Sequence, residues 1–268
     1  MHNKTKKNLR IFGDGEYPGG DYKKIRILGD GQLTGSITAK SIKIFGDGEF
    51  LGDVETEKLV VLGDANFKGC VKAKKISILG DSTFEADVDC ELLSIKGATT
   101  LHGCTITKEL KIYGECQVQK QLKAILLKSY GSLCGQGDIL TDEFISYGEL
   151  CTKGAVEAEK LTVKGTINHA KLLSGEHVRI ELADHCTCDE IGGAVVEVVK
   201  YKGNTNVGKV SLTVSTVEAD RMTLAYVNAI NVSGDIIEIN ESCDIERAHY
   251  FSELSIHETS KVKQSEKN

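Results

Sequence analysis

Hydrophobic and polar positions alternate along this chain in a pattern that repeats every 17 residues. The clearest marker of the repeat is a glycine, which aspartate follows in the early copies. It recurs without an insertion at Gly29, Gly46, Gly63, Gly80, Gly97, Gly114, Gly131, Gly148 and Gly165. An earlier copy at Gly13 is one residue short of this spacing. Repetition of this regularity is typical of solenoids, in which each repeat forms one coil.

Apolar residues within a repeat lie two positions apart, which is the spacing along one face of a β-strand. Around Gly46 they are Ile42 and Ile44 before the glycine, and Phe50 and Val54 after it. Glycines and charged residues separate these segments, as turns require, and glycine and β-branched residues are too frequent for helices. We therefore predict an all-β fold, a single-stranded β-solenoid with about 17 residues and three short strands per coil, whose coils stack about 4.8 Å apart.

The range of the strict repeat sets the predicted organisation of the chain. After Gly165 the period dissolves, although strand-like alternation persists at Val196 and Val198 and the repeat spacing partly returns near Met222. We predict a polar tail, a regular solenoid, a less regular continuation and a second polar tail, covering residues 1–8, 9–165, 166–256 and 257–268 respectively. A second β subdomain is the alternative for the third segment.

Composition excludes several classes of function. The 268 residues carry a net charge of −6, which argues against a nucleic-acid partner. The first residues are polar and basic without an apolar segment behind them, and no apolar run approaches the length that spans a bilayer. Nine cysteines, an odd number without paired spacing, fit a reducing compartment better than a disulfide framework. We expect a cytoplasmic location.

The sequence gives little support to catalysis or to a cofactor. The GDG triplets lack the GxxxxGK[ST] pattern and a following helix, so they are not phosphate loops. No serine or cysteine stands in a recognisable nucleophile context. His185, Cys186 and Cys188 suggest a metal, but in a strand the two cysteines face one way and the histidine the other. We expect buried cysteines, no metal, no cofactor and no enzymatic activity.

Three columns of outward-facing residues are the remaining candidates for a functional surface. The residue before each repeat glycine is often apolar, and we predict an exposed stripe of Leu28, Phe45, Leu62, Leu79, Tyr113, Tyr130 and Tyr147. Such a stripe either contacts a partner or a second copy, or is covered by another part of the chain. The aspartates after the glycines are expected to accept hydrogen bonds from the amides of their own turns. Lysines near another corner, interrupted by glutamates, predict a solvated mixed-charge edge.

The repeat IxIxGDGxxxGxVxAK, from Leu9 to Gly165, resembles that of the bactofilins, the bacterial polymer-forming cytoskeletal proteins. The phrase SGDIIEINESCDIERAHYFSEL, from Ser233 to Leu254, is similar to the end region of the longer Firmicutes members. The resemblance implies a right-handed β-helix that polymerises end to end without nucleotide. It also implies a scaffold for cell-shape, cell-wall or motility machinery.

The expected function is therefore a non-enzymatic homopolymer that assembles through its solenoid ends, because terminal coils leave strand edges unpaired. The candidate residues for that contact are Ile11, Phe12, Tyr250, Phe251 and Leu254. Cell-envelope or motility proteins are the other expected partners, and the location is the cytoplasm, including the zone beneath the membrane. The stretch MHNKTKKN has no apolar residue beyond Met1, which argues against direct membrane binding. The alternative function is a non-polymerising β-solenoid rod that docks a partner protein on the exposed stripe.

Overall fold

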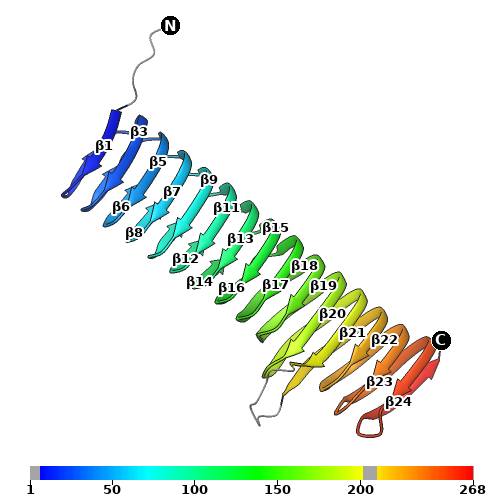
Figure 1. Cartoon of the computed structure of the whole chain (residues 1–268). Helices are drawn as coiled ribbons and strands as arrows, with labels where there is room; N and C mark the ends of the chain where they lie inside the picture. The colour runs from blue at the N-terminus through cyan, green and yellow to red at the C-terminus, as the bar shows by residue number, and fades with distance from the viewer. Residues whose placement is uncertain (1–6, 202–209, 268) are drawn as a thin grey trace. The chain divides into compact units, whose positions relative to one another are not determined.

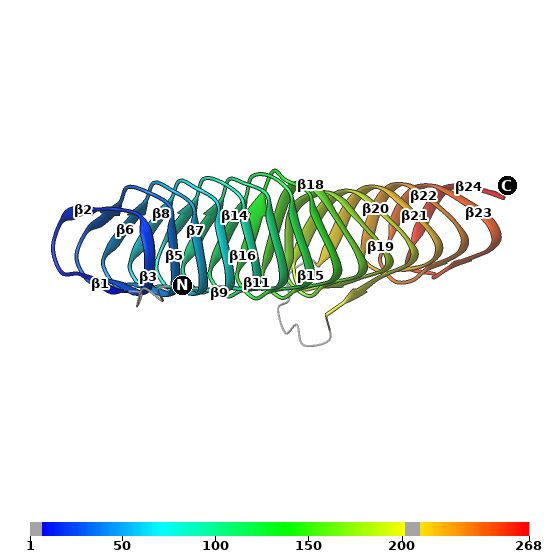
Figure 2. The same ribbon diagram turned by 90° about the horizontal axis from the view of Figure 1, so that it is seen from above.

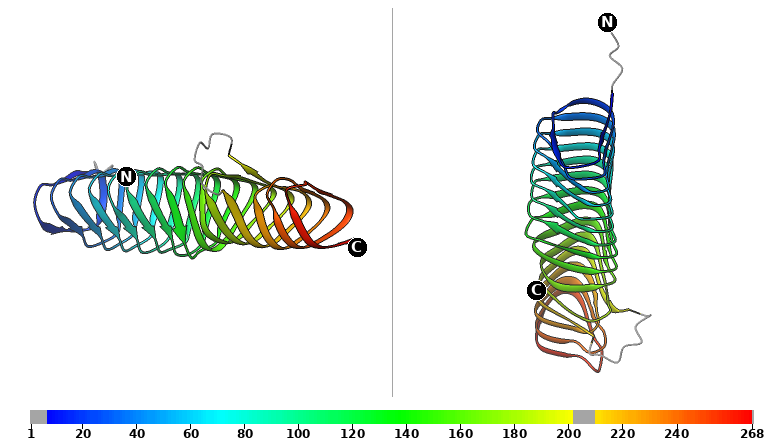
Figure 3. Two further views of the ribbon diagram at one scale, coloured as in Figure 1. Left: turned by 90° about the horizontal axis from the view of Figure 1, so that it is seen from below. Right: turned by 90° about the vertical axis from the view of Figure 1, so that its left-hand side faces the viewer.

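The computed structural model describes residues 7–201 and 210–267, and in these ranges every regular element is a β-strand (Figure 1). The chain divides into two compact units, the first ending at Ile125 and the second beginning at Leu126. Each unit is a β-solenoid of parallel coils, and Figures 2 and 3 show neighbouring coils stacked side by side within each unit. The predicted all-β solenoid is thereby confirmed, while its handedness stays a prediction.

In the first unit, strands of eight residues alternate with strands of three or four after a short first pair. The strands are β1 (Lys7–Ile11), β2 (Gly15–Tyr17), β3 (Gly20–Ile27), β4 (Gly31–Leu33), β5 (Ile37–Ile44), β6 (Asp47–Phe50), β7 (Val54–Val61), β8 (Asp64–Phe67), β9 (Val71–Ile78), β10 (Ser82–Phe84), β11 (Val88–Ile95), β12 (Ala98–Leu101), β13 (Thr105–Ile112) and β14 (Glu115–Val118). Strand β15 (Leu122–Ser129) includes the boundary between the units.

Each eight-residue strand contains two of the three predicted segments. In β5 the side chains of Ile37 and Ala39 are buried, and so are those of Ile42 and Ile44. Alternation therefore skips one position at Lys40, where the strand turns a corner, and pairing with the next coil resumes at Ser41 in the same strand. The coil still has three faces, but only two of its three corners interrupt the strands, one at each end of the short strand.

The 17-residue register stacks equivalent side chains directly on one another. Ile37 pairs with Val54 and Ile44 with Val61, and the same offset continues into β9 and β11. The rings of Phe50, Phe67 and Phe84 stack with neighbouring centroids 4.8 Å apart. The hydrophobic stabilisation therefore comes from continuous internal columns and not from one globular core.

Side-chain volume is balanced between neighbouring columns. Two positions before the stacked phenylalanines stand the small residues Gly48, Ala65 and Ser82, which leave room for the rings. A Cβ added at Gly48 would lie 3.2 Å from the Cε2 atom of Phe50. In β16 (Ser132–Gly135) of the second unit the order reverses, because buried Leu133 precedes Gly135 by two positions. Such compensation keeps the interior filled at native density.

The repeat glycines are explained by close approach between coils. A Cβ added at Gly97 would lie 2.0 Å from the carbonyl oxygen of Gly80 and 2.8 Å from that of Leu79. Both distances are shorter than a carbon and an oxygen can tolerate. The turn requirement inferred from the sequence is therefore only part of the reason, since none of these glycines has the positive φ that favours glycine over other residues.

The second unit continues the coils with uneven lengths. Its further strands are β17 (Ile139–Ser146), β18 (Glu149–Val163), β19 (Thr166–Leu182), β20 (His185–Lys200), β21 (Ser211–Leu224), β22 (Val227–Ile239), β23 (Asp244–Ile256) and β24 (Lys261–Lys267). One internal column runs through successive pairings as Leu161, Val178, Val196, Met222, Ile237 and Leu254. Residues 166–201 and 210–256 thus form coils that follow β18 by parallel pairing.

The expected terminal tails need a correction. Lys7 and Asn8 belong to β1, and the polar segment after residue 257 contains β24, which pairs with β23 from Asp244 to Tyr250. The side chains of β24 are largely exposed, so its pairing rests on backbone hydrogen bonds and on exposed contacts such as that of Lys263 with Glu246. A strand of this kind cannot be predicted from the spacing of apolar residues, because nearly all of its own side chains are polar.

Candidate interaction surfaces

An apolar ridge runs along one corner of the first unit. Its members directly precede the repeat glycines and lie between 41% and 71% exposed: Phe12, Leu28, Phe45, Leu62 and Leu79. In the next coil Lys96 replaces the apolar residue, and exposed Tyr113 follows. Within residues 7–201 and 210–267 no part of the chain covers this ridge.

The same column continues in the second unit with two aromatic residues. Tyr130 and Tyr147 are exposed, and their rings stack with centroids 5.1 Å apart and planes 4° apart. All seven residues of the predicted stripe are therefore exposed in their respective units. What contacts them stays a prediction.

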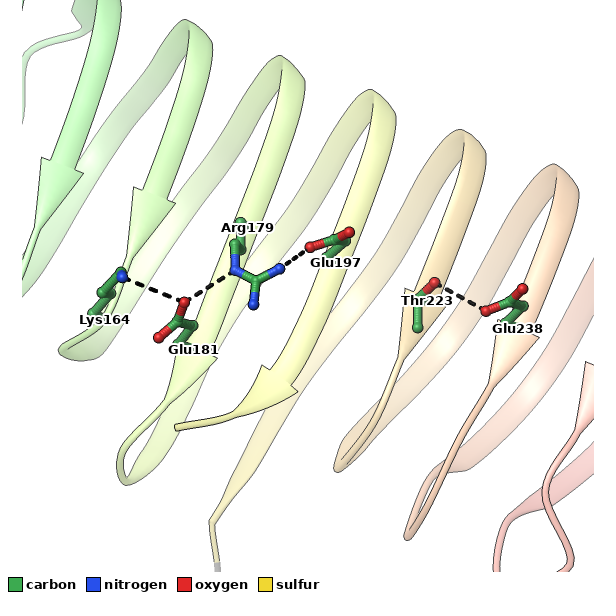
Figure 4. Close-up of polar contacts among 6 residues, drawn as sticks. All are labelled: Lys164, Arg179, Glu181, Glu197, Thr223 and Glu238. Carbon is green, nitrogen blue, oxygen red and sulfur yellow. Dashed lines mark hydrogen bonds and ion pairs between the residues drawn. The ribbon is translucent and has the colours of Figure 1, made fainter. Parts of the chain in front are cut away.

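After Tyr147 the column becomes charged and joins a polar ladder (Figure 4). The Nζ atom of Lys164 lies 3.4 Å from Glu181, whose Oε1 atom accepts a hydrogen bond of 3.0 Å from Nε of Arg179. Arg179 also pairs with Glu197 in the next coil. The hydrogen bond to Glu181 raises the pKa of the Arg179 guanidinium. Exposed pairs contribute up to about 1 kcal/mol each, so this ladder adds modestly to coil stacking.

Aspartates at a second corner tie successive coils together. The carboxylates of Asp53 and Asp87 each accept a hydrogen bond of 2.8 Å from the backbone N–H 17 residues later, at Cys70 and Cys104. At the ridge corner, Asp81 accepts one of 3.3 Å from Ala98. For Asp81, one of the aspartates that follow the repeat glycines, the expected bond within the same turn is wrong, because stacking brings the amide of the next coil closer.

Two open grooves follow the first unit. One, of about 690 Å³, runs over β4, β6, β8 and β10 beside the aspartates of the ridge corner. The other, of about 890 Å³, follows the corner at Ala39, and charges of alternating sign line it from coil to coil: Lys40, Glu57, Lys74, Glu91 and Lys108. Lys108 Nζ lies 3.4 Å from Glu91 Oε1. This corner is therefore a mixed-charge edge, with one ion pair between Lys108 and Glu91.

Cys186 and Cys188 face the opposite side of their strand from His185, as strand alternation predicted. Cys186 and Cys188 are buried, whereas His185 is exposed and its Nδ1 atom lies 2.8 Å from the hydroxyl of Ser211. Burial raises the pKa of the Cys188 thiol to about 12, which keeps it protonated and unreactive. Among residues 7–201 and 210–267 no group of three or more His, Cys, Asp or Glu side chains could hold a metal ion.

The N-terminal end of the first unit leaves strand edges open. Within the described chain β1 pairs only with β3, and β2 only with β4. Of the two candidate residues here, Phe12 is exposed at the corner, but Ile11 is completely buried inside its coil. Ile11 can therefore stabilise the terminal coil by packing inside it, but its side chain cannot contact a second copy directly.

The C-terminal end of the second unit is partly covered. Strand β24 pairs with β23 as far as Tyr250, and no described strand pairs with residues 251–256 on that side. Phe251 is exposed, while Tyr250 and Leu254 are half-buried. Exposed Ile256 belongs to the same open edge and was missed, because its column is interior in every preceding coil.

Comparison with known proteins identifies part of the chain. Residues 27–123 match the family model for bactofilins, which is described as polymer-forming cytoskeletal. This segment is a bactofilin domain. The bactofilin domain lies within the first unit and carries the ridge from Leu28 onward. Searches of curated proteins and of solved structures returned no match. No helix in the described part of the chain has the length and apolar character to cross a membrane.

Proposed function

We propose that this protein is a non-enzymatic, nucleotide-independent cytoskeletal scaffold that polymerises through the ends of its solenoid. The bactofilin domain and the β-solenoid fold support a polymer-forming cytoskeletal protein. The proposal places it in the cytoplasm, including beneath the membrane, where it organises cell-shape, cell-wall or motility machinery.

The observation that carries the proposal is the pair of open strand edges. At one end, β1 and β2 each present an unpaired edge, and at the other the segment 251–256 does the same. Unpaired edges template further strand pairing. Exposed Phe12 and Phe251 beside these edges add apolar area to an end contact. A contact between different ends propagates into a filament unless it closes by symmetry.

A charge at the C-terminal edge tests this contact. We expect Phe251→Glu to shorten or abolish filaments, because a carboxylate in the end contact loses its hydration. Ile230→Glu is the matched control, since Ile230 is also an exposed apolar residue but its strand β22 is paired on both sides. The readouts are negative-stain electron microscopy and sedimentation, with far-ultraviolet circular dichroism to verify the fold. Filaments of normal length from folded Phe251→Glu would show that this end makes no contact.

A further inference from the structure

We infer that the apolar ridge of the first unit pairs side by side with the ridge of a second copy, with the two chains running parallel. This contact is separate from the end contact of the proposed function and does not depend on it. It assigns an occupant to a surface that the described chain leaves uncovered.

The regular spacing of the ridge favours a second copy. Its five side chains follow the coil register without a gap and end where Lys96 enters the column. A second ridge has the same spacing, so every side chain of one copy meets an equivalent position of the other. A row of contacts held by one rigid scaffold also binds more tightly than its separate members, because the first contact brings the others together.

Charges flank the ridge with opposite sign on its two sides. Two residues after each ridge position stands an exposed aspartate: Asp14, Asp30, Asp47, Asp64 and Asp81. Two residues before it stand Arg10, Arg26 and Lys43 in the first three coils, and uncharged Val60 and Ser77 in the next two. Within residues 7–201 and 210–267 the three basic side chains form no ion pair, so they are available to a partner.

This asymmetry selects the relative direction of the two copies. A two-fold axis parallel to the stacking direction places the basic flank of one copy against the acidic flank of the other. The nearest opposed charges would then be Arg26 and Asp30 of different copies. An axis perpendicular to the stacking direction instead opposes the two rows of aspartates, and like charges brought together cost free energy. Charge complementarity therefore favours the parallel arrangement.

A matched pair of substitutions tests the contact itself. Leu62 and Leu51 are the same residue type and both are 41% exposed, but only Leu62 lies on the ridge. The substitutions are made in Phe251→Glu, which removes end-to-end growth and is called the parent here. We expect sedimentation equilibrium to show dimers for the parent and for the parent carrying Leu51→Lys. We expect Leu62→Lys to weaken dimerisation by at least about tenfold, because a buried ammonium is left unpaired.

Three outcomes overturn the inference: monomers of the parent at every concentration, equal dimerisation of Leu62→Lys and the parent, or equal loss in Leu51→Lys. If Phe251→Glu still forms filaments, the proposed end contact has failed instead. The ridge is then tested in the wild-type background by the width of filaments and by whether they associate in pairs.

Cysteine cross-linking determines the direction. In the parallel arrangement equivalent positions meet, so Leu28→Cys and Leu62→Cys should each form covalent dimers alone under mild oxidation. In an antiparallel arrangement centred on Phe45, covalent dimers require a mixture of the two variants. Wild-type protein treated in the same way measures the background from exposed Cys70. Cross-linking only in the mixture would contradict the parallel arrangement.

Discussion

Adding one methyl group to the repeat-glycine column should destabilise the stack far more than its size suggests. In Gly97→Ala the new Cβ would lie 2.0 Å from the Gly80 carbonyl oxygen, so the coils have to separate locally by roughly an ångström. Adjacent bonds hold the coils together at this point, including Lys96 N–H to Ile78 O at 2.8 Å and Ala98 N–H to Asp81 Oδ1 at 3.3 Å. Loss of these two bonds costs about 1 kcal/mol each and overpacking costs about 1–3 kcal/mol, so the free energy of unfolding should fall by about 3–5 kcal/mol.

Thermal melts followed by far-ultraviolet circular dichroism in the Phe251→Glu background measure this cost. We expect the midpoint of Gly97→Ala to fall by at least about 6 °C. The control is Gly192→Ala in β20, where the nearest atoms to an added Cβ, Glu218 O and Ser174 Oγ, lie 3.9 Å away and a methyl group can be accommodated. We expect less than half the loss for the control. An unchanged midpoint for Gly97→Ala, or equal losses in both variants, would refute the close-approach explanation.

Two further predictions follow from buried polar groups. Thr105 is buried with no hydrogen-bond partner for its Oγ1 atom, and Val88 occupies the same column one coil earlier. Thr105→Val should therefore stabilise the protein by about 1 kcal/mol, measured as a higher urea midpoint. A lower midpoint would show that the hydroxyl has a partner. Burial raises the pKa of Cys188 to about 12 and of Cys90 to about 11 from the usual 9.0. As the pH rises above 9 the unfolded chain loses these protons while the folded chain retains them, so stability falls by up to about 1.4 kcal/mol per pH unit for each thiol. Cys188→Ala should reduce this fall relative to wild type in urea titrations from about pH 8 to about pH 11, and identical slopes would contradict the assignment.

The interior of the solenoid could be predicted from the sequence because each internal column contains the same kind of residue in successive repeats. Ile42, Leu59 and Ile76 occupy one column, and their shared apolar character fixes both the strand face and the period. The exposed ridge followed from the same alternation, since Phe45 directly follows the inward residue Ile44.

Features that depend on contacts between coils could not be predicted in the same way. The carboxylate of Asp53 binds an amide 17 residues away, and its choice between that amide and its own turn depends on the stacking geometry. Strand β24 pairs through its backbone, which polar side chains such as Lys263 and Glu266 do not reveal. The eight-residue strands arise because the corner at Lys40 interrupts pairing at that residue alone, whereas side-chain alternation suggests a break between two strands.

Electron microscopy of the wild-type protein in nucleotide-free buffer tests the central claim most directly. The account predicts filaments that form without nucleotide and are lost in Phe251→Glu but not in Ile230→Glu. Discrete particles of single-chain length, at low and high salt alike, would contradict polymerisation through the solenoid ends.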